Sequence, residues 1–245
     1  MSAPDVTVTP RLDPVGAGNG VVAPHDLALD RELWRWVPDS VALYVTRTRP
    51  IDVAVGAELA EVLRDGDALT QGCREVAEAD PGVTAYLCTS ASFIRGVAGE
   101  AELRAVMERA GARRAITTSG ALLDALAALG ARRVAIATPY DAELTAQLAA
   151  FLGEAGHRVA GTARLGLDGD IWRVTEASVR ELVHALPPAD AVVISCTNLP
   201  TYDALPRLEQ ELDRPVVSAN LATMWAALRA LDALPSGRPE RLFNC

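Results

Sequence analysis

The sequence predicts an α/β protein of two pseudo-symmetric halves, each a mainly parallel sheet flanked by helices, with an active site in the cleft between them. Two observations carry this prediction. Short apolar segments alternate with longer amphipathic stretches along the 245 residues, a pattern typical of parallel sheets covered by helices. In addition, three short motifs recur in the same order in both halves of the chain, which indicates an internal repeat.

The predicted strands are short, rich in Val, Ile and Ala, and bounded by turn residues. In chain order they cover residues 20–23, 41–46, 84–87, 115–117, 133–138, 158–165, 191–195 and 215–218. Predicted helices between them cover residues 101–111, 119–129, 141–153 and 221–231. Gly111, Gly130 and Gly156 stand where the left-handed residue that ends a helix is expected.

The domain organisation follows from the repeat. Residues 1–18 are rich in Pro, Asp and Gly and lack periodicity, which predicts a flexible N-terminal arm. The first half is predicted to combine residues 19–118 with residues 219–245, and the second half to span residues 119–218. In this arrangement the helix after each half carries the chain across to the other, so the last helix closes the first half.

Composition and charge exclude several classes of function. A net charge of −9 is unsuited to nucleic-acid binding, which needs a basic face. No apolar run approaches a membrane span, and the N-terminus lacks the features of a secretory segment. We therefore expect a cytoplasmic protein with free thiols. The four cysteines form no C-x-x-C pair and no Gly-rich phosphate loop is present, so neither a metal nor a nucleotide cofactor is expected.

The repeated motifs are short and polar. They pair Pro24-His25-Asp26 with Pro139-Tyr140-Asp141, Cys88-Thr89-Ser90 with Cys196-Thr197-Asn198, and Thr118-Ser119-Gly120 with Ser218-Ala219-Asn220. All six segments lie at the carboxyl ends of predicted strands, where parallel sheets bind their ligands. If the two halves pack face to face, the motifs converge on one cleft.

Cys88 and Cys196 are the candidate catalytic residues. A single cysteine at the end of an apolar strand is usually a small buried hydrophobic residue. The symmetric pair favours catalysis, because each cysteine is followed by Thr and then by Ser or Asn, at a turn whose N–H groups and side chains stabilise a thiolate or an oxyanion. The pKa of a thiol near a helix N-terminus can fall well below about 8.5. Two thiols facing one carbon can exchange a proton between its faces, or one thiolate can attack carbon.

The neighbouring polar residues are candidate substrate ligands. Thr89, Ser90, Thr197 and Asn198 supply hydroxyl and amide groups directly after the cysteines. The phenol of Tyr140 either donates a hydrogen bond to a carboxylate or an enolate, or caps the core.

Three further residues have competing interpretations. His25 is either a proton carrier or a surface histidine. Asp26 either faces the substrate or caps a helix that begins near Leu29. Ser119 either binds an anion at a helix start or serves only as the N-cap.

These motifs resemble the aspartate/glutamate racemase superfamily, and within it the branch of maleate cis-trans isomerases and arylmalonate decarboxylases. The resemblance spans nearly the whole chain from residue 20. It is carried by residues 88–96 (CTSASFIRG), 132–140 (RRVAIATPY), 195–199 (SCTNL), 215–225 (PVVSANLATMW) and 241–243 (RLF). It implies two Rossmann-like halves, no metal, no cofactor, and a dicarboxylate or related carboxylate bound between two cysteine-bearing turns.

The resemblance also implies roles for these residues. Arylmalonate decarboxylases carry Gly where this chain has Cys88, so the presence of both thiols favours isomerisation or racemisation. In maleate isomerases the first thiolate is thought to add to the double bond, and rotation then gives fumarate. Carried over, Cys88 is the nucleophile and Cys196 the acid/base, while Thr89, Ser90 and Tyr140 hold carboxylates.

One departure concerns the loop after the first strand. Maleate isomerases usually have an Asn there that contacts substrate, whereas this chain has Pro24-His25-Asp26. A carboxylate at this place repels a dianion unless it is protonated or turned away.

Three hypotheses follow. The first is a cofactor-independent two-thiol isomerase that converts maleate to fumarate. The second is another reaction of the superfamily: decarboxylation of substituted malonates with Cys196 as proton donor, or amino-acid racemisation, including a role in ectoine utilisation because the Cys-Thr-Asn-Leu motif of those proteins is similar to residues 196–199. The third is a protein that binds a small carboxylate without turnover. A homodimer is compatible with the family, although no segment indicates an interface.

Overall fold

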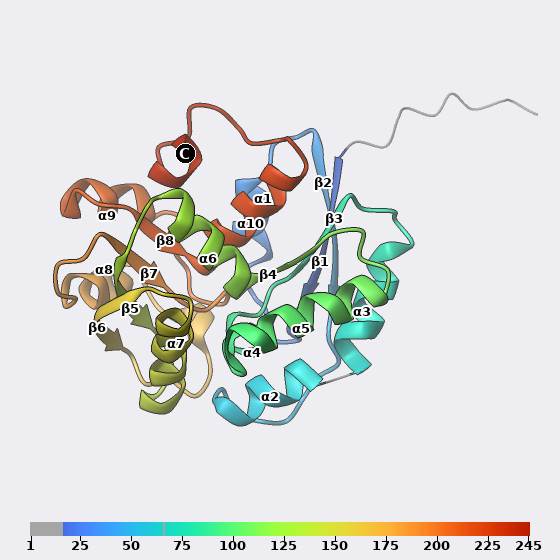
Figure 1. Cartoon of the computed structure of the whole chain (residues 1–245), viewed down its shortest axis with the longest axis horizontal. Helices are drawn as coiled ribbons and strands as arrows, with labels where there is room; N and C mark the ends of the chain where they lie inside the picture. The colour runs from blue at the N-terminus through green and yellow to red at the C-terminus, as the bar shows by residue number, and fades with distance from the viewer. Residues whose placement is uncertain (1–16, 66) are drawn as a thin grey trace, which may run out of the picture.

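The computed structural model of the chain describes residues 17–65 and 67–245 (Figure 1). The predicted flexible arm lies mostly outside these residues. Its last two residues, Ala17 and Gly18, are the start of the first strand and so do not belong to an arm. Among the described residues, no helix combines the length and the apolar character needed to cross a membrane.

Two four-stranded parallel sheets form the two halves. The first contains β1 (Ala17–Ala23), β2 (Val41–Arg47), β3 (Val83–Tyr86) and β4 (Ala115–Thr117) in the order β2-β1-β3-β4. The second contains β5 (Arg133–Thr138), β6 (Arg158–Arg164), β7 (Ala191–Ile194) and β8 (Val216–Ser218) in the order β6-β5-β7-β8. The shared order confirms the predicted fold class, and every predicted strand is present.

The central strands are buried on both faces. In β5 and β7 the segments Val134–Ala137 and Ala191–Ile194 are at most 2% exposed. Continuous apolar runs of this kind, rather than alternation, are typical of parallel strands covered by helices on both sides.

The helices cover the two sheets and connect the strands. They are α1 (Asp30–Trp36), α2 (Ala57–Asp65), α3 (Asp67–Ala77), α4 (Thr89–Phe93), α5 (Gly96–Arg109), α6 (Thr118–Ala128), α7 (Ala142–Glu154), α8 (Glu176–His184), α9 (Leu205–Leu212) and α10 (Ala219–Ala230), with 3-10 turns η1 (Ile171–Arg173) and η2 (Arg241–Asn244). The four predicted helices are present as α5, α6, α7 and α10, although α5 begins at Gly96 rather than at residue 101. Gly111, Gly130 and Gly156 follow α5, α6 and α7 with positive φ angles of 112°, 64° and 91°, as predicted.

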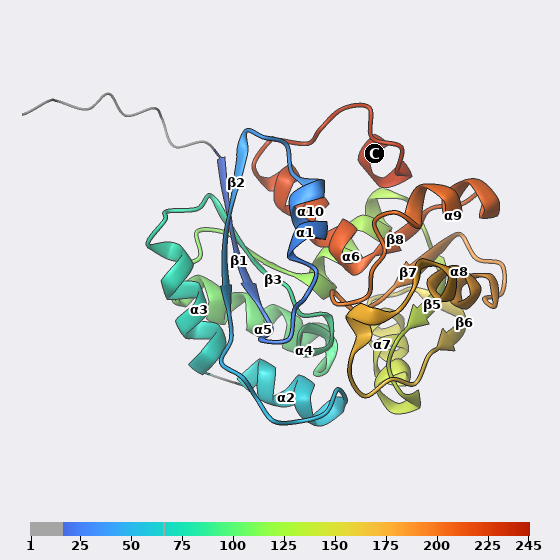
Figure 2. The ribbon, with the colours of Figure 1, turned by 180° about the vertical axis from the view of Figure 1, so that it is seen from behind.

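The two halves meet along α6 and α10, which lie side by side between the sheets (Figures 1 and 2). The hydroxyl of Thr223 on α10 donates to the hydroxyl of Thr118 on α6 at 3.1 Å. The helix α10 packs against β3 and β4 of the first sheet and against β8 of the second. Its residues Ala219–Leu228 are all buried. Because α10 contacts both sheets, the predicted boundaries at residues 118 and 218 stay a prediction.

Candidate functional site

A cavity of about 40 Å³ lies between the halves, at the carboxyl ends of β1, β3, β5 and β7. Both candidate cysteines line it, and both are nearly buried, with 4% of Cys88 and 9% of Cys196 exposed. Its full lining is Pro24, Asp26, Val55, Leu59, Leu63, Cys88, Thr89, Ser90, Tyr140, Ile171, Cys196, Thr197 and Asn198. The structure therefore brings together every predicted site residue except Ser119.

Hydrogen bonds from two serine hydroxyls hold the turn that carries Cys88. Cys88 is the N-cap residue of the short helix α4, where the sequence indicated only a strand-to-loop turn. The hydroxyl of Ser92 donates to the carbonyl of Cys88 at 2.7 Å, and the hydroxyl of Ser119 donates to the carbonyl of Thr89 at 3.0 Å. Ser119 therefore supports the turn rather than lining the cavity. It is not the N-cap of α6 either, because Thr117 fills that place and accepts from the N–H of Gly120.

Polar groups from both halves line the cavity: Thr89 and Ser90 follow Cys88, and Tyr140 follows β5. The hydroxyl of Thr89, a residue only 2% exposed, has no partner among the described residues. The hydroxyl of Ser90 lies 3.8 Å from the sulfur of Cys88. The phenol of Tyr140 accepts from Ser195 at 3.3 Å and hydrogen-bonds the thiol of Cys196. A buried hydroxyl without a partner is costly, so the hydroxyl of Thr89 is a candidate donor to a ligand in the cavity.

The turn that carries Cys196 is bound to the first half. The hydroxyl of Thr197 donates to the carbonyl of Leu87 at 3.0 Å. The amide of Asn198 donates to the carbonyl of Asp26 at 2.9 Å and accepts from the N–H of Ala28 at 3.0 Å. Thr197 and Asn198 are predicted to bind substrate, but these side-chain groups form hydrogen bonds between the halves instead. The two turns are similar in sequence but differ in the donors they leave free.

A buried carboxylate that the sequence analysis missed fixes the same turn. Glu32 on α1 is 8% exposed and accepts from the N–H and the hydroxyl of Thr201 at 3.1 and 2.9 Å. It also accepts from the amide of Asn220 at 3.0 Å, and that amide donates to the carbonyl of Thr197 as well. The available signal is the spacing of Glu32 and Trp36, which places an acidic residue on the apolar face of a short helix.

Asp26 faces the cavity instead of capping a helix. The N-cap position of α1 is occupied by Leu29, which makes no side-chain capping bond. The carboxylate of Asp26 lies 3.5 Å from the amide nitrogen of Asn198, and its charge contributes to raising the pKa of both Cys88 and Cys196. His25 does not line the thiol cavity.

Burial raises the pKa of both candidate thiols. The pKa of Cys88 is about 11 and that of Cys196 about 12, because desolvation outweighs the hydrogen bonds that favour the thiolate. For Cys88 those bonds come from the N–H of Ala91 and the hydroxyl of Ser90, and for Cys196 from the N–H of Asn198 and from Tyr140. The expectation that these turns lower the thiol pKa is therefore wrong, and both groups carry their protons at neutral pH.

The apolar part of the lining adjoins a groove. Val55, Leu59, Leu63 and Ile171 make up this part, and all of them except Leu63 also line the groove. The groove beyond it, of about 230 Å³, is lined by His25, Asp168, Trp172 and neighbouring residues. The N–H of Val55 donates to the carbonyl of Asp168 at 3.0 Å and so connects the two segments that border the groove.

The arrangement combines three chemical elements. Unpartnered or lightly engaged donors, four apolar side chains and two protonated thiols line the same small space. All four cysteines of the chain are free, so neither thiol is held in a disulfide. No arginine lines the cavity. A carboxylate bound here is therefore held by hydroxyl and N–H dipoles rather than by an ion pair.

Comparisons with known proteins agree with this architecture. The family model for arylmalonate decarboxylase matches residues 38–241. The arylmalonate decarboxylase of Bordetella bronchiseptica is 35% identical over 205 residues, which cover 78% of this chain and 85% of that protein. The maleate isomerase of Geobacillus stearothermophilus is 30% identical over 183 residues, 70% of this chain and 73% of that protein.

A solved structure of a doubly substituted arylmalonate decarboxylase in its liganded form superimposes with a TM-score of 0.83 at 30% identity, covering 93% of this chain and 99% of that one. The match thus extends over both sheets and over the cavity between them. The chain belongs to the arylmalonate decarboxylase family, in the branch that it shares with the maleate isomerases.

Proposed function

We propose that this chain is a cofactor-independent enzyme that decarboxylates a 2-substituted malonate, with Cys196 as the proton donor. The carbon–carbon bond to one carboxylate breaks, and its electron pair moves into an enediolate on the retained carboxylate. The thiol of Cys196 then gives its proton to the α-carbon, and the resulting thiolate regains a proton from water. The observation that carries the proposal is the cavity whose lining combines free hydrogen-bond donors, apolar side chains and protonated thiols.

The hydrogen-bond donors of the lining suit the retained carboxylate. In this proposal the hydroxyls of Thr89 and Ser90 and the phenol of Tyr140, all in the cavity lining, donate to the negative charge that develops on the enediolate. Preorganised donors of this kind stabilise such a charge more than they stabilise the ground state. Burial also raises the pKa of Tyr140 well above its usual value, so its phenol remains a donor.

The apolar side chains of the lining suit the departing carboxylate and the substituent. A carboxylate placed against Leu59 and Ile171 finds no side-chain cation, and Asp26 lies in the same lining. Its charge is therefore poorly solvated and repelled, and loss of CO₂ relieves both penalties. The presence of Asp26, which argues against a stable dianion complex, thus supports a reaction that discards one of the two charges.

The protonated state of the thiols supports this chemistry over nucleophilic addition. A thiol with a pKa of about 12 is protonated at neutral pH, so it can donate its proton without prior activation. Addition of Cys88 to a double bond needs a thiolate at rest, which a pKa of about 11 disfavours.

A second candidate function is isomerisation, which the placement of Cys88 favours. Cys88 and Cys196 line the same cavity and are close enough for the charge of each to affect the other. Two thiols allow racemisation of a 2-substituted carboxylate, or maleate isomerisation as in the related maleate isomerases. Maleate isomerisation receives less support, because maleate has two carboxylates to hold and, of the two cysteine turns, only that of Cys88 leaves donors free. Amino-acid racemisation, a role in ectoine utilisation, carboxylate binding without turnover and a homodimer stay predictions.

One set of assays separates these functions. Purified protein is supplied with an arylmalonate, with maleate and with one enantiomer of a 2-arylpropionate, beside the variants Cys88→Gly, Cys88→Ser and Cys196→Ser. Decarboxylation is expected in the wild type and in Cys88→Gly, and Cys196→Ser is expected to lose about 10²–10⁴-fold, the usual contribution of a general acid. Fast maleate turnover that both serine variants lose, with inert malonates, would instead establish the isomerase.

The pH dependence of the rate is a second test, because the two reactions predict different profiles. A reaction that needs protonated Cys196 keeps its rate from about pH 6 to about pH 9, since its pKa lies far above that range. A reaction that needs a resting thiolate speeds up about tenfold per pH unit over the same range. Alkylation of the thiols by iodoacetamide, which requires the thiolate, serves as the internal standard for the second behaviour.

A further inference from the structure

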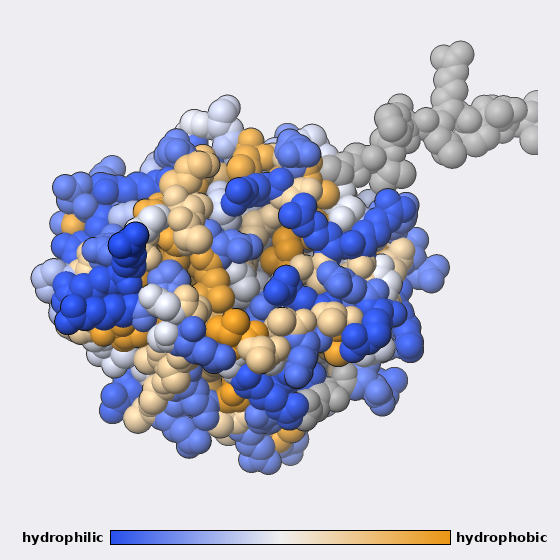
Figure 3. All heavy atoms as spheres, viewed as in Figure 1, coloured by the Kyte–Doolittle hydropathy of each residue, from blue (hydrophilic) through white to orange (hydrophobic). Residues whose placement is uncertain are grey.

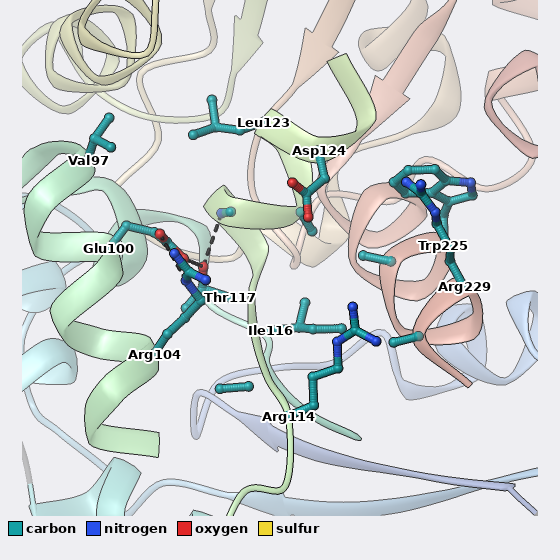
Figure 4. Close-up of a pocket in the computed structure, with 15 residues that line it drawn as sticks. Val97, Glu100, Arg104, Arg114, Ile116, Thr117, Leu123, Asp124, Trp225 and Arg229 are labelled. Atoms are coloured by element: carbon teal, nitrogen blue, oxygen red, sulfur yellow. Dashed lines mark hydrogen bonds and ion pairs between the residues drawn. The ribbon is translucent and has the colours of Figure 1, made fainter. Parts of the chain in front are cut away.

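A second and larger groove lies at the free edge of β4, away from the thiols. Its volume is about 490 Å³, and it shares no lining residue with the thiol cavity. Its walls come from α5, β4, α6 and α10 (Figure 4). On the face shown in Figure 3, apolar residues gather in a band over α6, with hydrophilic residues beside it. A volume of this size is within the usual range of small-molecule sites.

Two arginines of this groove have no carboxylate partner. Arg114 precedes β4 and Arg229 lies near the end of α10, and both are exposed. Within residues 17–65 and 67–245, neither guanidinium forms an ion pair or a side-chain hydrogen bond. Arg229 lies over the ring of Trp225 at 5.2 Å from its centroid, a contact that restrains the side chain without neutralising it. In Figure 4, Arg114 extends into the groove from the start of β4, and Arg229 lies along Trp225 on the α10 wall of the same groove.

The nearest buried carboxylate does not cancel these charges. Glu100 is 3% exposed and accepts from the hydroxyl of Thr117 at 2.6 Å and from Arg104 at 2.9 Å. Its charge is therefore already matched by Arg104, one turn away on α5. Asp124 on α6 is the remaining acidic residue of the lining. Two unmatched arginines against one aspartate leave a positive charge of about one unit, in a chain whose net charge is −9.

Apart from Thr117, the rest of the lining is apolar. Ile116 of β4 lies beside Arg114, whereas Val97 and Leu123 line the end of the groove nearer α5 (Figure 4). We propose that this groove binds a monoanionic carboxylate with an apolar body, whose head group meets Arg114 and Arg229 and whose body packs against Ile116 and the alanines of α10 that line the groove, Ala226 and Ala230. Guanidinium groups hold carboxylates through paired N–H donors, and Asp124 limits the net charge to one that a single carboxylate matches. This proposal does not depend on the reaction at the thiols.

The test measures benzoate binding by calorimetry in a Thr89→Val background, which removes the anion donor of the catalytic cavity. Saturable binding of one benzoate per chain is expected. Arg114→Gln and Arg229→Gln are each expected to weaken it about tenfold, the usual loss for one charged hydrogen bond. Arg113→Gln is the matched control, since that neighbouring arginine is paired with Asp80 and lies outside the groove.

Two further probes separate charge from apolar contact. Benzamide has the same shape without the charge, and inorganic phosphate has charge without the apolar body, so both are expected to bind at least about tenfold more weakly than benzoate. The proposal is overturned by any of three results: no saturable benzoate binding, equal binding of benzamide, or unchanged binding in the Arg114→Gln/Arg229→Gln double variant. Any benzoate bound at the thiol cavity survives in that double variant and is thereby distinguished.

Discussion

The most unusual single residue of the site is Cys196, whose φ of 86° is in the left-handed region. This backbone conformation costs a residue with a side chain about 1–3 kcal/mol, so surrounding contacts must hold the residue in it. Those contacts are the hydrogen bonds made by Thr197, Asn198 and Asn220. Cys88 reaches the same cavity with an extended backbone, at φ −139°. The two thiols are therefore equivalent in sequence pattern but not in conformation.

Paired substitutions at the two cysteines measure this strain. Cys196→Gly is expected to be at least as stable as Cys196→Ala, because the left-handed backbone costs a residue with a Cβ about 1–2 kcal/mol. At Cys88 the order reverses, with the Gly variant less stable than the Ala variant by about 1 kcal/mol. Urea unfolding with equal m-values gives the comparison. Finding Ala more stable than Gly at both positions would contradict a strained Cys196.

Glu32 acts as a positioning residue for the Cys196 turn. In Glu32→Gln, an NH₂ group replaces one oxygen and faces donors from Thr201 or Asn220, so a loss of about 1–3 kcal/mol in the free energy of unfolding is expected. Turnover of the folded variant should also fall, since the turn loses its anchor. Asp203→Asn is the control, because the exposed Asp203–Arg35 pair contributes about 0–1 kcal/mol and lies outside the cavity. Wild-type turnover in Glu32→Gln would refute the positioning role.

At the scale of elements, the cavity is closed by α2 and η1 rather than by the sheets. Leu59 and Leu63 on α2 and Ile171 of η1 belong to the apolar part of its lining. A cavity of about 40 Å³ is smaller than an arylmalonate, so these elements must yield to admit one. The side chains of α2 and η1 therefore determine which substituent on the α-carbon of the substrate fits.

Removing one of these side chains is expected to widen access. Leu59→Ala should speed alkylation of the thiols by iodoacetamide and shift turnover toward bulkier substituents, at a stability cost of about 2–5 kcal/mol. Leu69→Ala on α3 is the matched control: Leu69 is fully buried but does not line the cavity, so it should cost similar stability without faster alkylation. Equal alkylation rates in the two variants would exclude α2 as the barrier.

The elements themselves were largely predictable from sequence. The strands stand out because buried parallel strands read as short apolar runs between turn residues. No range was predicted for the helices α2, α8 and α9. The helix α4 was missed as well, because its five residues are too few for a periodic pattern. The two cysteine turns were found from their repeat. Glu32, Thr201 and Asn220 were not linked, because their hydrogen bonds join residues far apart in the chain, and the difference between Thr89 and Thr197 arises from one contact with Leu87.

At the scale of the whole molecule, buried thiols couple the fold to pH. Burial raises the pKa of Cys73 to about 12, as it raises those of Cys88 and Cys196. The ordinary thiol value is 9.0. Above that value the unfolded chain releases protons that the folded chain retains, so the unfolded state gains stability as pH rises. The contribution of these thiols to stability is therefore complete below pH 9 and is lost between pH 9 and the raised values.

The free energy of unfolding is accordingly expected to fall steeply above about pH 9, by up to about 1.4 kcal/mol per pH unit for each buried thiol. Chemical denaturation at a series of pH values gives the slope. Cys73→Ala should remove one thiol's share of it, whereas Cys245→Ala, at an exposed position, should leave it unchanged. A slope that Cys73→Ala does not alter would show that this thiol titrates normally.

The hydrogen bonds that cross between the halves have a mechanical consequence. Three of these hydrogen-bonded contacts join the halves near the thiols: Thr197 with Leu87, Asn198 with the loop after β1, and Glu32 with Thr201. These bonds oppose hinge opening of the two halves, so we expect molecules to enter and leave past α2 and residues 51–56 and 168–173, which border the cavity and the groove. The residence time of a product then depends on these segments, and changes in them can alter turnover while the reacting groups stay as they are.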